Sequence, residues 1–388
     1  MQPNTGRTYF AVAAPGLEPY TLEELRLLGM KVGQSQAEKR GEKLEGGVEF
    51  TGSLEDLYRA NLHLRTASRI LVRLGAFYAA GFPELRRKTA RLPWEQYLRP
   101  GRPVALRVTC HKSRLYHSGA VAERVAAAIG DSMGEPPVIA RFDEDAGEDL
   151  PQLVVVRIAS DLCTISVDSS GSLLNRRGYR LATAKAPLRE SLAAGILMAA
   201  GWDRSSPLID PFCGSGTIPI EAALMMRRIP PGGGRPFAFM EWPGFQQRQW
   251  DELMAEGLQN VLPSSEKLIQ ASDRDAGAIQ AAQANAERAG VIEDIHFACQ
   301  SVSAMEPNGE KGWVVANPPY GLRTSPNKDL RNLYAQFGNV LNARFKGWHV
   351  AVLSSDVRLL RQMHVRFEHL ISLVNGGVQV KLAVGKVT

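Results

Sequence analysis

The feature that most limits how this chain can fold is an alternation of helical and strand-like segments in its second half. The segments follow one another as helix 188–200, strand 207–212, helix 217–228, strand 267–273, helix 275–289, strand 313–319, helix 329–345 and strand 348–355. Such alternation predicts an open parallel sheet with helices on both faces. Because ligands of these sheets bind at the carboxyl ends of the strands, the residues after each strand are the first candidates for a functional site.

The first 170 residues have a different, α+β pattern, with a strand-like run and a helix before residue 30 and two β-rich runs before residue 168. A chain of 388 residues is expected to form two or three compact units. We predict units at 1–60, 61–170 and 171–388, with the basic segment 175–180 at the last junction.

Composition excludes several classes of protein and favours one kind of partner. The N-terminus lacks the apolar run of a secretory signal, and no segment reaches the roughly 18 unbroken apolar residues of a membrane span. The net charge of +6 favours a polyanionic partner. The cysteines lack a CxxC pair, so we expect neither a metal site nor disulfides, and a cytoplasmic location; they are Cys110, Cys163, Cys213 and Cys299.

A glycine-containing turn follows the strand at 207–212 and precedes a helix. Glycines let a ligand approach the backbone, and the start of the helix offers unpaired N–H groups. A phosphate-binding P-loop needs Lys where Thr217 stands, so a compact zwitterionic cofactor fits better, with a plain strand-to-helix turn as the alternative. The candidate cofactor-binding residues here are Asp210, Pro211, Phe212, Cys213, Gly214, Gly216 and Thr217.

Two further motifs follow strands. Asp273 ends the strand at 267–273, where an acidic group can bind ribose hydroxyls, although Asp273 or Asp275 could instead cap the next helix. The segment 317–321 reads NPPYG and ends the strand at 313–319. Methyl transfer to an aromatic amine needs acceptors for the amine hydrogens and an aromatic ring to stack on the base. Its candidate catalytic residues are Asn317, Pro318, Pro319 and Tyr320.

Together these motifs resemble those of the class I methyltransferases that modify exocyclic amines. The whole chain is similar to the THUMP-domain RNA methyltransferases, in particular the bacterial large-subunit rRNA guanine-N2 methyltransferase group. The similarity also includes AAPGLEPYTLEELRLLG near the N-terminus, NRRGYR at 175–180 and APLRESLAAGILMAAGW before the glycine turn. It implies a ferredoxin-like unit at 1–60, a THUMP RNA-binding domain at 61–170 and a Rossmann-like methyltransferase domain at 171–388.

The resemblance also implies roles for particular residues. The glycine turn would bind the methionine end of S-adenosylmethionine, Asp273 its ribose, and the NPPY residues the target amine. Glu190 lies, with Arg189, in the stretch that resembles the family's extra cofactor-facing helix. Where relatives carry an Asp for the adenine amine, this chain has Gln300 and Ser301, either of which, or a backbone group, would replace it.

Two smaller sets of residues have candidate roles. Cys213 as a covalent nucleophile is less favoured than Cys213 as a small side chain in a tight loop, because an exocyclic amine needs no covalent adduct. Arg-rich stretches can bind phosphates, although each is also typical of a solvated face. The predicted RNA-binding residues are Arg176, Arg177, Tyr179 and Arg180.

The sequence therefore predicts methylation of guanine N2 in 23S rRNA or a large-subunit precursor, with S-adenosylmethionine as cofactor and without metal, membrane or obligate protein partner. The enzymatic alternatives are guanine-N2 methylation of tRNA and adenine-N6 methylation of RNA or DNA. A noncatalytic RNA-binding assembly factor is the alternative of another class. Larger relatives in the ribosomal group carry a second methyltransferase domain, and no second activity is expected here because the chain ends soon after Val387.

Overall fold

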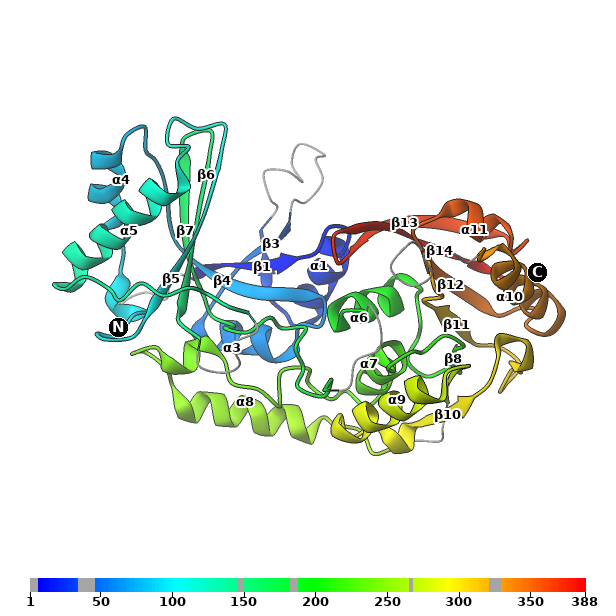
Figure 1. Cartoon of the computed structure of the whole chain (residues 1–388). Coiled ribbons are helices and arrows are strands. Elements are labelled where there is room, and N and C mark those ends of the chain that lie inside the picture. Colours follow the sequence, from blue (N-terminus) through cyan, green and yellow to red (C-terminus); the bar gives the residue numbers. More distant parts are fainter. Residues whose placement is uncertain (1–5, 34–45, 145–149, 182–187, 265–267, 321–328) are drawn as a thin grey trace. The chain divides into compact units, whose positions relative to one another are not determined.

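A computed structural model describes residues 6–33, 46–144, 150–181, 188–264, 268–320 and 329–388 (Figure 1). The chain divides into two compact units, each built from separate stretches of sequence. The first unit comprises Met1–Val12, Leu22–Leu174 and Arg235–Met254, and the second comprises Ala13–Thr21, Asn175–Gly234 and Ala255–Thr388.

The first unit is built on one seven-stranded sheet in the order β2-β3-β1-β4-β7-β6-β5. Its strands are β1 (Arg7–Ala13), β2 (Lys31–Val32), β3 (Gly47–Gly52), β4 (Ala67–Tyr78), β5 (Val104–His111), β6 (Gln152–Ala159) and β7 (Leu162–Asp168). Its helices include α1 (Glu18–Leu27), which starts in the second unit, α3 (Leu54–His63), α4 (Phe82–Thr89) and α5 (Ser118–Met133). The long strand β4 joins the N-terminal strands to β5–β7, and α3 runs across residues 60 and 61, where the sequence suggested a boundary.

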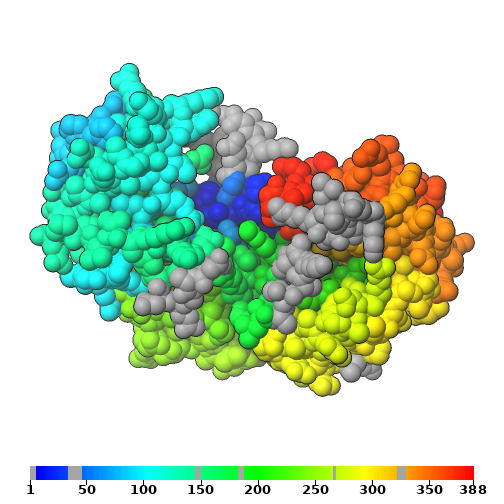
Figure 2. Space-filling view, viewed as in Figure 1, coloured from blue at the N-terminus to red at the C-terminus, as the bar shows by residue number. Residues whose placement is uncertain are grey.

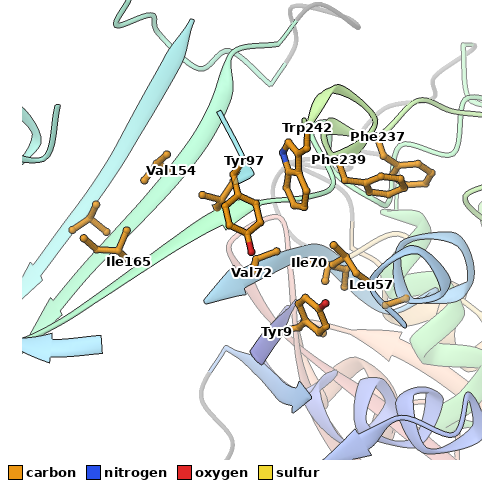
Figure 3. Close-up of a cluster of buried hydrophobic side chains, with 14 of the residues drawn as sticks. Tyr9, Leu57, Ile70, Val72, Tyr97, Val154, Ile165, Phe237, Phe239 and Trp242 are labelled. Carbon is orange, nitrogen blue, oxygen red and sulfur yellow. The ribbon is translucent and has the colours of Figure 1, made fainter. Parts of the chain in front are cut away.

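Residues from after the glycine turn complete the core of the first unit. The segment Arg235–Met254 contains a short helix η2 (Ala238–Glu241) and most of α8 (Gln247–Gln259). Figure 3 shows its aromatic rings beside residues of the sheet. Tyr58 stacks on Phe239 with ring centroids 4.5 Å apart, and Trp242 Nε1 donates a 2.8 Å hydrogen bond to Gln152.

The second unit contains the alternating segments and confirms an α/β fold. Its sheet has the order β10-β9-β8-β11-β12-β14-β13, and the pairs from β10 to β12 are parallel. The strands are β8 (Leu208–Asp210), β9 (Ile269–Asp273), β10 (Ile295–Cys299), β11 (Trp313–Ala316), β12 (His349–Ser354), β13 (Phe367–Asn375) and β14 (Val378–Lys386). The sheet is mixed, however, because β14 pairs antiparallel with both β12 and β13.

Helices cover both faces of this sheet because the central strands are apolar on both sides. Leu208 packs with the core cluster on one face, and the next residue, Ile209, packs with the cluster on the other. Val314 and Val315 divide in the same way. The helices are α6 (Glu190–Ala199), α7 (Thr217–Met226) and α9 (Ala276–Arg288) on one face, with α10 (Arg331–Arg344) and α11 (Val357–Arg361) on the other.

A turn near the N-terminus packs against β13 in the second unit. Gly16 has φ +93°, and a Cβ there would lie 2.2 Å from the Ser372 carbonyl oxygen. The next residue, Leu17, is fully buried in the core cluster that also contains Leu373. The turn therefore fits β13 closely only with glycine at position 16.

Gly16→Ala should destabilise the protein more than Gly29→Ala. Both glycines have left-handed φ angles, which cost a residue with a side chain roughly 1–2 kcal/mol, but nothing lies within 4 Å of a Cβ at Gly29. The additional loss of unfolding free energy in Gly16→Ala measures the clash with β13. Urea denaturation of both variants measures the two free energies. Equal losses would show that β13 moves away without cost.

Candidate active site

The glycine turn lies between β8 and α7 at the carboxyl end of the sheet. Gly214 and Gly216 take left-handed φ angles of 51° and 85°. A Cβ at Gly216 would lie 3.0 Å from the side chain of Ala282 on α9, so glycine allows the two helices to approach. No side chain caps the first turn of α7, and that turn carries no acidic residue. Its N–H groups are therefore suited to bind an anionic group such as a carboxylate.

Two carboxylates hold the loops at this edge. Asp210 is almost completely buried and accepts a 3.0 Å hydrogen bond from the Phe212 amide. Asp273 accepts hydrogen bonds from the amides of Gly214, at 3.1 Å, and Asp275, at 3.0 Å. Asp273 thus links the loop after β9 to the glycine turn after β8.

This pair of acidic side chains suits a cationic ligand, because a nearby positive charge favours the ionised form of a carboxyl group. Within the described ranges, neither Asp210 nor Asp273 has an Arg or Lys partner. Burial, together with the nearby Asp273 carboxylate, raises the pKa of Asp210 to about 8. S-Adenosylmethionine carries an ammonium and a sulfonium group as well as a carboxylate, so these acids and the start of α7 fit the cofactor that the resemblance implies.

The structure separates the two acidic residues that the sequence left as alternatives. Asp275 caps α9, because its Oδ1 accepts hydrogen bonds from Gly277 at 2.9 Å and Ala278 at 3.4 Å. Asp273 makes no such cap and points its carboxylate to the glycine turn. The role of Asp273 in holding ribose stays a prediction.

The other residues of the glycine turn are mostly buried. The ring of Phe212 contacts Phe337 on α10 edge-on, with centroids 5.3 Å apart. Pro211 and Thr217 are buried. Cys213 is also buried, and this burial raises the pKa of its thiol well above the usual value, which disfavours the thiolate a nucleophile needs.

The NPPY segment follows β11, the strand beside β8. Asn317 Oδ1 is buried and has no hydrogen-bond partner among the described residues. Pro318 is buried, and the Tyr334 hydroxyl lies 3.5 Å from the Pro319 carbonyl oxygen, to which it donates. The Tyr320 hydroxyl accepts a 3.0 Å hydrogen bond from Asn375 Nδ2. Gly321 lies outside the described residues.

A buried acceptor without a donor is rare in folded proteins, because desolvation costs about 1–3 kcal/mol without compensation. The unsatisfied atom here is Asn317 Oδ1, and Asn317 directly follows β11, the strand that pairs with β8. A ligand that donates a hydrogen bond would satisfy it.

Gln300 and Ser301 lie after β10, next to the end of β9. The Gln300 amide donates a 3.0 Å hydrogen bond to the Asp273 carbonyl. Ser301 is exposed, and its hydroxyl lies 2.6 Å from that of Ser303. Gln300 is therefore beside Asp273, Ser301 follows it in the chain, and the assignment of either to the adenine amine stays a prediction.

The basic segment 175–180 is mainly internal, which corrects part of the RNA-binding prediction. Arg177 and Tyr179 are buried, and both contact the Glu221 carboxylate of α7, Arg177 at 3.4 Å and Tyr179 at 3.0 Å. Arg180 forms a 2.9 Å ion pair with Glu190 at the start of α6. Buried groups cannot contact a phosphate in this conformation, which excludes Arg177 and Tyr179, whereas the exposed Arg176 and the partly exposed Arg180 keep the predicted role as a prediction.

Sequence reasoning missed Glu221 and Asn375. The sequence does contain a signal for Glu221, because it is the only charged residue in the helix TIPIEAALMM. The other residues of that helix are apolar apart from Thr217. A lone charge in such a helix indicates a buried partner of opposite charge. Glu190, which was predicted to bind cofactor, is likewise buried and paired, and burial raises its pKa.

Within the described ranges, no three His, Cys, Asp or Glu side chains lie close enough together to hold a metal ion. Over the same ranges, no helix is long and apolar enough to cross a membrane.

The raised pKa of Asp210 predicts a pH dependence of stability. The folded chain keeps a proton on Asp210 up to about pH 8, whereas the unfolded chain loses it near its ordinary pKa of about 4. This stabilising contribution is complete below pH ~4 and is lost as the pH rises to about 8, at up to ~1.4 kcal/mol per pH unit.

Asp210→Asn should therefore make the ligand-free protein's unfolding free energy less dependent on pH between 5 and 8, as measured by denaturation at several pH values. Asp203→Asn is the control, because Asp203 is exposed and hydrogen bonds from Ser206 and Ser205 outweigh desolvation and lower its pKa, so it stays ionised across that range. If Asp210→Asn retains the wild-type pH slope, Asp210 is ionised in the folded chain.

Comparison with known proteins agrees with this geometry. Residues 177–382 match the model of the RMKL-like methyltransferase domain, residues 8–71 the RlmL ferredoxin-like domain, and residues 79–168 the THUMP domain. The chain is 36% identical over 389 residues to the ribosomal RNA large subunit methyltransferase K/L of Syntrophotalea carbinolica, covering 96% of this chain and 53% of that protein. It thus spans about half the length of that relative.

Two other matches extend over nearly the full length of both proteins. The chain is 34% identical to a protein of Synechocystis sp. that is provisionally named an RNA methyltransferase, covering 97% of this chain and 96% of that protein. The crystal structure of SMU.472, a proposed methyltransferase in complex with S-adenosylhomocysteine, superposes with a TM-score of 0.85 at 28% identity, covering 99% of this chain and 98% of that one. The chain therefore belongs to the RMKL-like methyltransferase family, with ferredoxin-like and THUMP domains before the methyltransferase domain.

Proposed function

We propose that this protein transfers a methyl group from S-adenosylmethionine to guanine N2 in 23S rRNA or a large-subunit precursor. The observation that carries the proposal is the buried Oδ1 of Asn317 at the carboxyl edge of the sheet, which has no hydrogen-bond partner in the described part of the chain. An exocyclic amine is a hydrogen-bond donor that satisfies this atom. The proposed substrate also implies a cytoplasmic enzyme.

In the proposed mechanism the chain mainly positions the amine. Asn317 Oδ1 and the Pro318 carbonyl accept the two N2 hydrogens, which directs the nitrogen lone pair toward the methyl donor. The ring of Tyr320 stacks on the base after it leaves its helix. Such positioning can remove ~7–11 kcal/mol of a bimolecular barrier.

S-Adenosylmethionine supplies an electrophilic methyl group, and Asp210, Asp273 and the start of α7 are the proposed groups that hold it. The amine nitrogen would form the new N–C bond as the bond between the methyl carbon and sulfur breaks, S-adenosylhomocysteine would leave with the sulfur's electron pair, and one N2 proton would then pass to water. No nucleophilic side chain is required, in agreement with the raised pKa of the Cys213 thiol.

Exposed side chains in the THUMP region offer a contact for RNA. In the loop 111–117, Leu115 is buried and anchors the loop, while the Arg114 amide donates a 2.7 Å hydrogen bond to Asp161. The side chain of Arg114 is 74% exposed and Tyr116 is 75% exposed. An exposed cation can bind phosphate and an exposed ring can stack on an unpaired base, so this loop replaces Arg177 and Tyr179 as a proposed RNA contact.

The reaction product tests the function. The protein is incubated with methyl-labelled S-adenosylmethionine and with separated rRNA and tRNA from cells lacking the gene, and the labelled nucleoside is identified by mass spectrometry. We expect N2-methylguanosine in large-subunit RNA. The same product in tRNA would change the substrate, N6-methyladenosine would change the base, and cofactor binding without any labelled product would favour an assembly factor.

Asn317→Ala should lower turnover by about 100-fold or more while leaving the Kd for S-adenosylmethionine within about twofold, because it removes an acceptor for the amine but no proposed cofactor contact. Calorimetry and single-turnover kinetics measure the two quantities. Asn308→Ala is the matched control, since Asn308 Oδ1 is also buried without a partner among the described residues. Equal losses of turnover and cofactor binding would refute the assigned role.

Arg114→Ala should weaken RNA binding and reduce the dependence of log K on log salt by roughly 0.7–0.9, the value for one lost phosphate contact. Fluorescence anisotropy at several salt concentrations measures both effects. Arg248→Ala is the control, because the Arg248 side chain is 93% exposed in the same unit. If both variants lose affinity equally, the effect reports net charge and no specific contact.

A further inference from the structure

The β13–β14 hairpin extends beyond the end of its neighbouring strand. The last residue of β12, Ser354, pairs with Lys381, whereas β14 begins at Val378. Residues 378–380 therefore extend past β12 by about 10 Å, at about 3.3 Å per residue. Because β14 runs antiparallel to β12, this extension lies at the carboxyl edge of the sheet, where the glycine turn and the NPPY segment also lie.

The turn at the tip of this hairpin does not explain why Asn stands at position 375, directly before the turn. Asn375 pairs with Val378, and the two residues between them, Gly376 and Gly377, have φ angles of 56° and 85°. Positive φ at both central positions is typical of a type I′ turn, so the glycines meet its requirement. Asn is disfavoured in strands, so the strand that Asn375 ends does not itself require Asn at this position.

The side chain of Asn375 instead reaches a residue 55 positions away in the sequence. Its Nδ2 donates a 3.0 Å hydrogen bond to the Tyr320 hydroxyl. Tyr320 is partly buried and packs against the core cluster that contains Leu373. Burial raises the pKa of Tyr320, although the hydrogen bond from Asn375 opposes this, so the hydroxyl stays neutral at physiological pH.

The Tyr320 ring is thus held at both ends. Its backbone follows Pro319, whose carbonyl accepts a hydrogen bond from Tyr334, and its hydroxyl is fixed at the hairpin tip. A ring held at one end only can change its side-chain torsions more freely. Fixing both ends restricts those torsions before substrate binds, which reduces the ordering that binding must supply.

We propose that Asn375 is a positioning residue for the methylation reaction, because its hydrogen bond fixes the plane of the Tyr320 ring on which the target base stacks. This inference rests on the proposed function of Tyr320. Asn375 does not contact the reacting atoms in this proposal and acts through Tyr320 alone.

A double-mutant cycle tests this dependence. Asn375→Ala should lower kcat for RNA methylation about five- to tenfold, the usual effect of one lost hydrogen bond, and leave the Kd for S-adenosylmethionine unchanged. In a Tyr320→Phe background, Asn375→Ala should have no further effect, because the hydroxyl that it holds is absent. Ser372→Ala is the control on the same hairpin, where Ser372 Oγ accepts a hydrogen bond from Lys381, and it should retain wild-type kcat.

A spectroscopic measurement separates this inference from the proposed function. The protein is labelled with fluorotyrosine, and the ¹⁹F resonance of Tyr320 is assigned by its absence in Tyr320→Phe. Asn375→Ala should shift and broaden that resonance, and Ser372→Ala should not, whether or not any RNA is methylated. Thermal unfolding of each variant confirms that the hairpin still folds.

Two results would overturn the inference. The first is an unchanged Tyr320 resonance in Asn375→Ala, which would show that the hydrogen bond does not hold the ring. The second is a loss of kcat that persists in the Tyr320→Phe background, which would show that Asn375 acts on the reaction by another route. Failure of wild-type protein to methylate RNA would instead refute the proposed function, and the fluorine measurement would still stand.

Discussion

The parallel pairing of β8 with β9 and β11 is the constraint on which the site depends. Ile209 pairs with Val314 and Asp210 with Ala271, so Asp273 and Asn317 lie beyond the end of β8 on either side of the glycine turn. Leu208 and Ile209 pack in the core clusters on opposite faces of the sheet. A register shift of one residue would exchange their faces, so burial on both faces fixes the register of β8. The hydrogen bond from the Gly214 amide to Asp273 then joins two of the loops into one rigid edge.

The sequence was sufficient to predict the centre of the second unit and its main motifs. Strands buried on both faces read as continuous apolar runs, and they alternate with helices that show a clear apolar spacing, so β8, β9, β11 and β12 fall within the predicted segments. The predicted parallel segments did not include the edge of the sheet beyond β12. There β13 and β14 join as an antiparallel hairpin, and strand direction depends on connections that local spacing does not report.

Contacts between residues that are far apart in the sequence account for the other differences between the predictions and the structure. Segment 175–180 was interpreted as an RNA-binding surface because charge is visible in the sequence and its partners are not. Arg177 meets Glu221 only after α7 has packed, and both side chains are then at most 3% exposed. Removing one partner of such a buried pair costs about 3–5 kcal/mol because the other charge is left buried and unpaired, so this basic segment is tied to the methyltransferase domain beside the glycine turn. Asn375 was missed for the same reason, since its contact with Tyr320 exists only in the folded sheet.

The interleaving of the two units has a consequence for how the protein is made. Phe239 and Trp242 belong to the core of the first unit, yet they are synthesised after the glycine turn of the second. A domain normally folds as soon as it leaves the ribosome, beginning with the N-terminal one. Here the first unit cannot close its core until residue 254 has emerged, by which time the first part of the methyltransferase domain is already outside the ribosome. The first unit must therefore leave the apolar surface that Phe239 and Trp242 cover unfilled while residues 175–254 are synthesised, and during that interval the surface is open to non-native contacts.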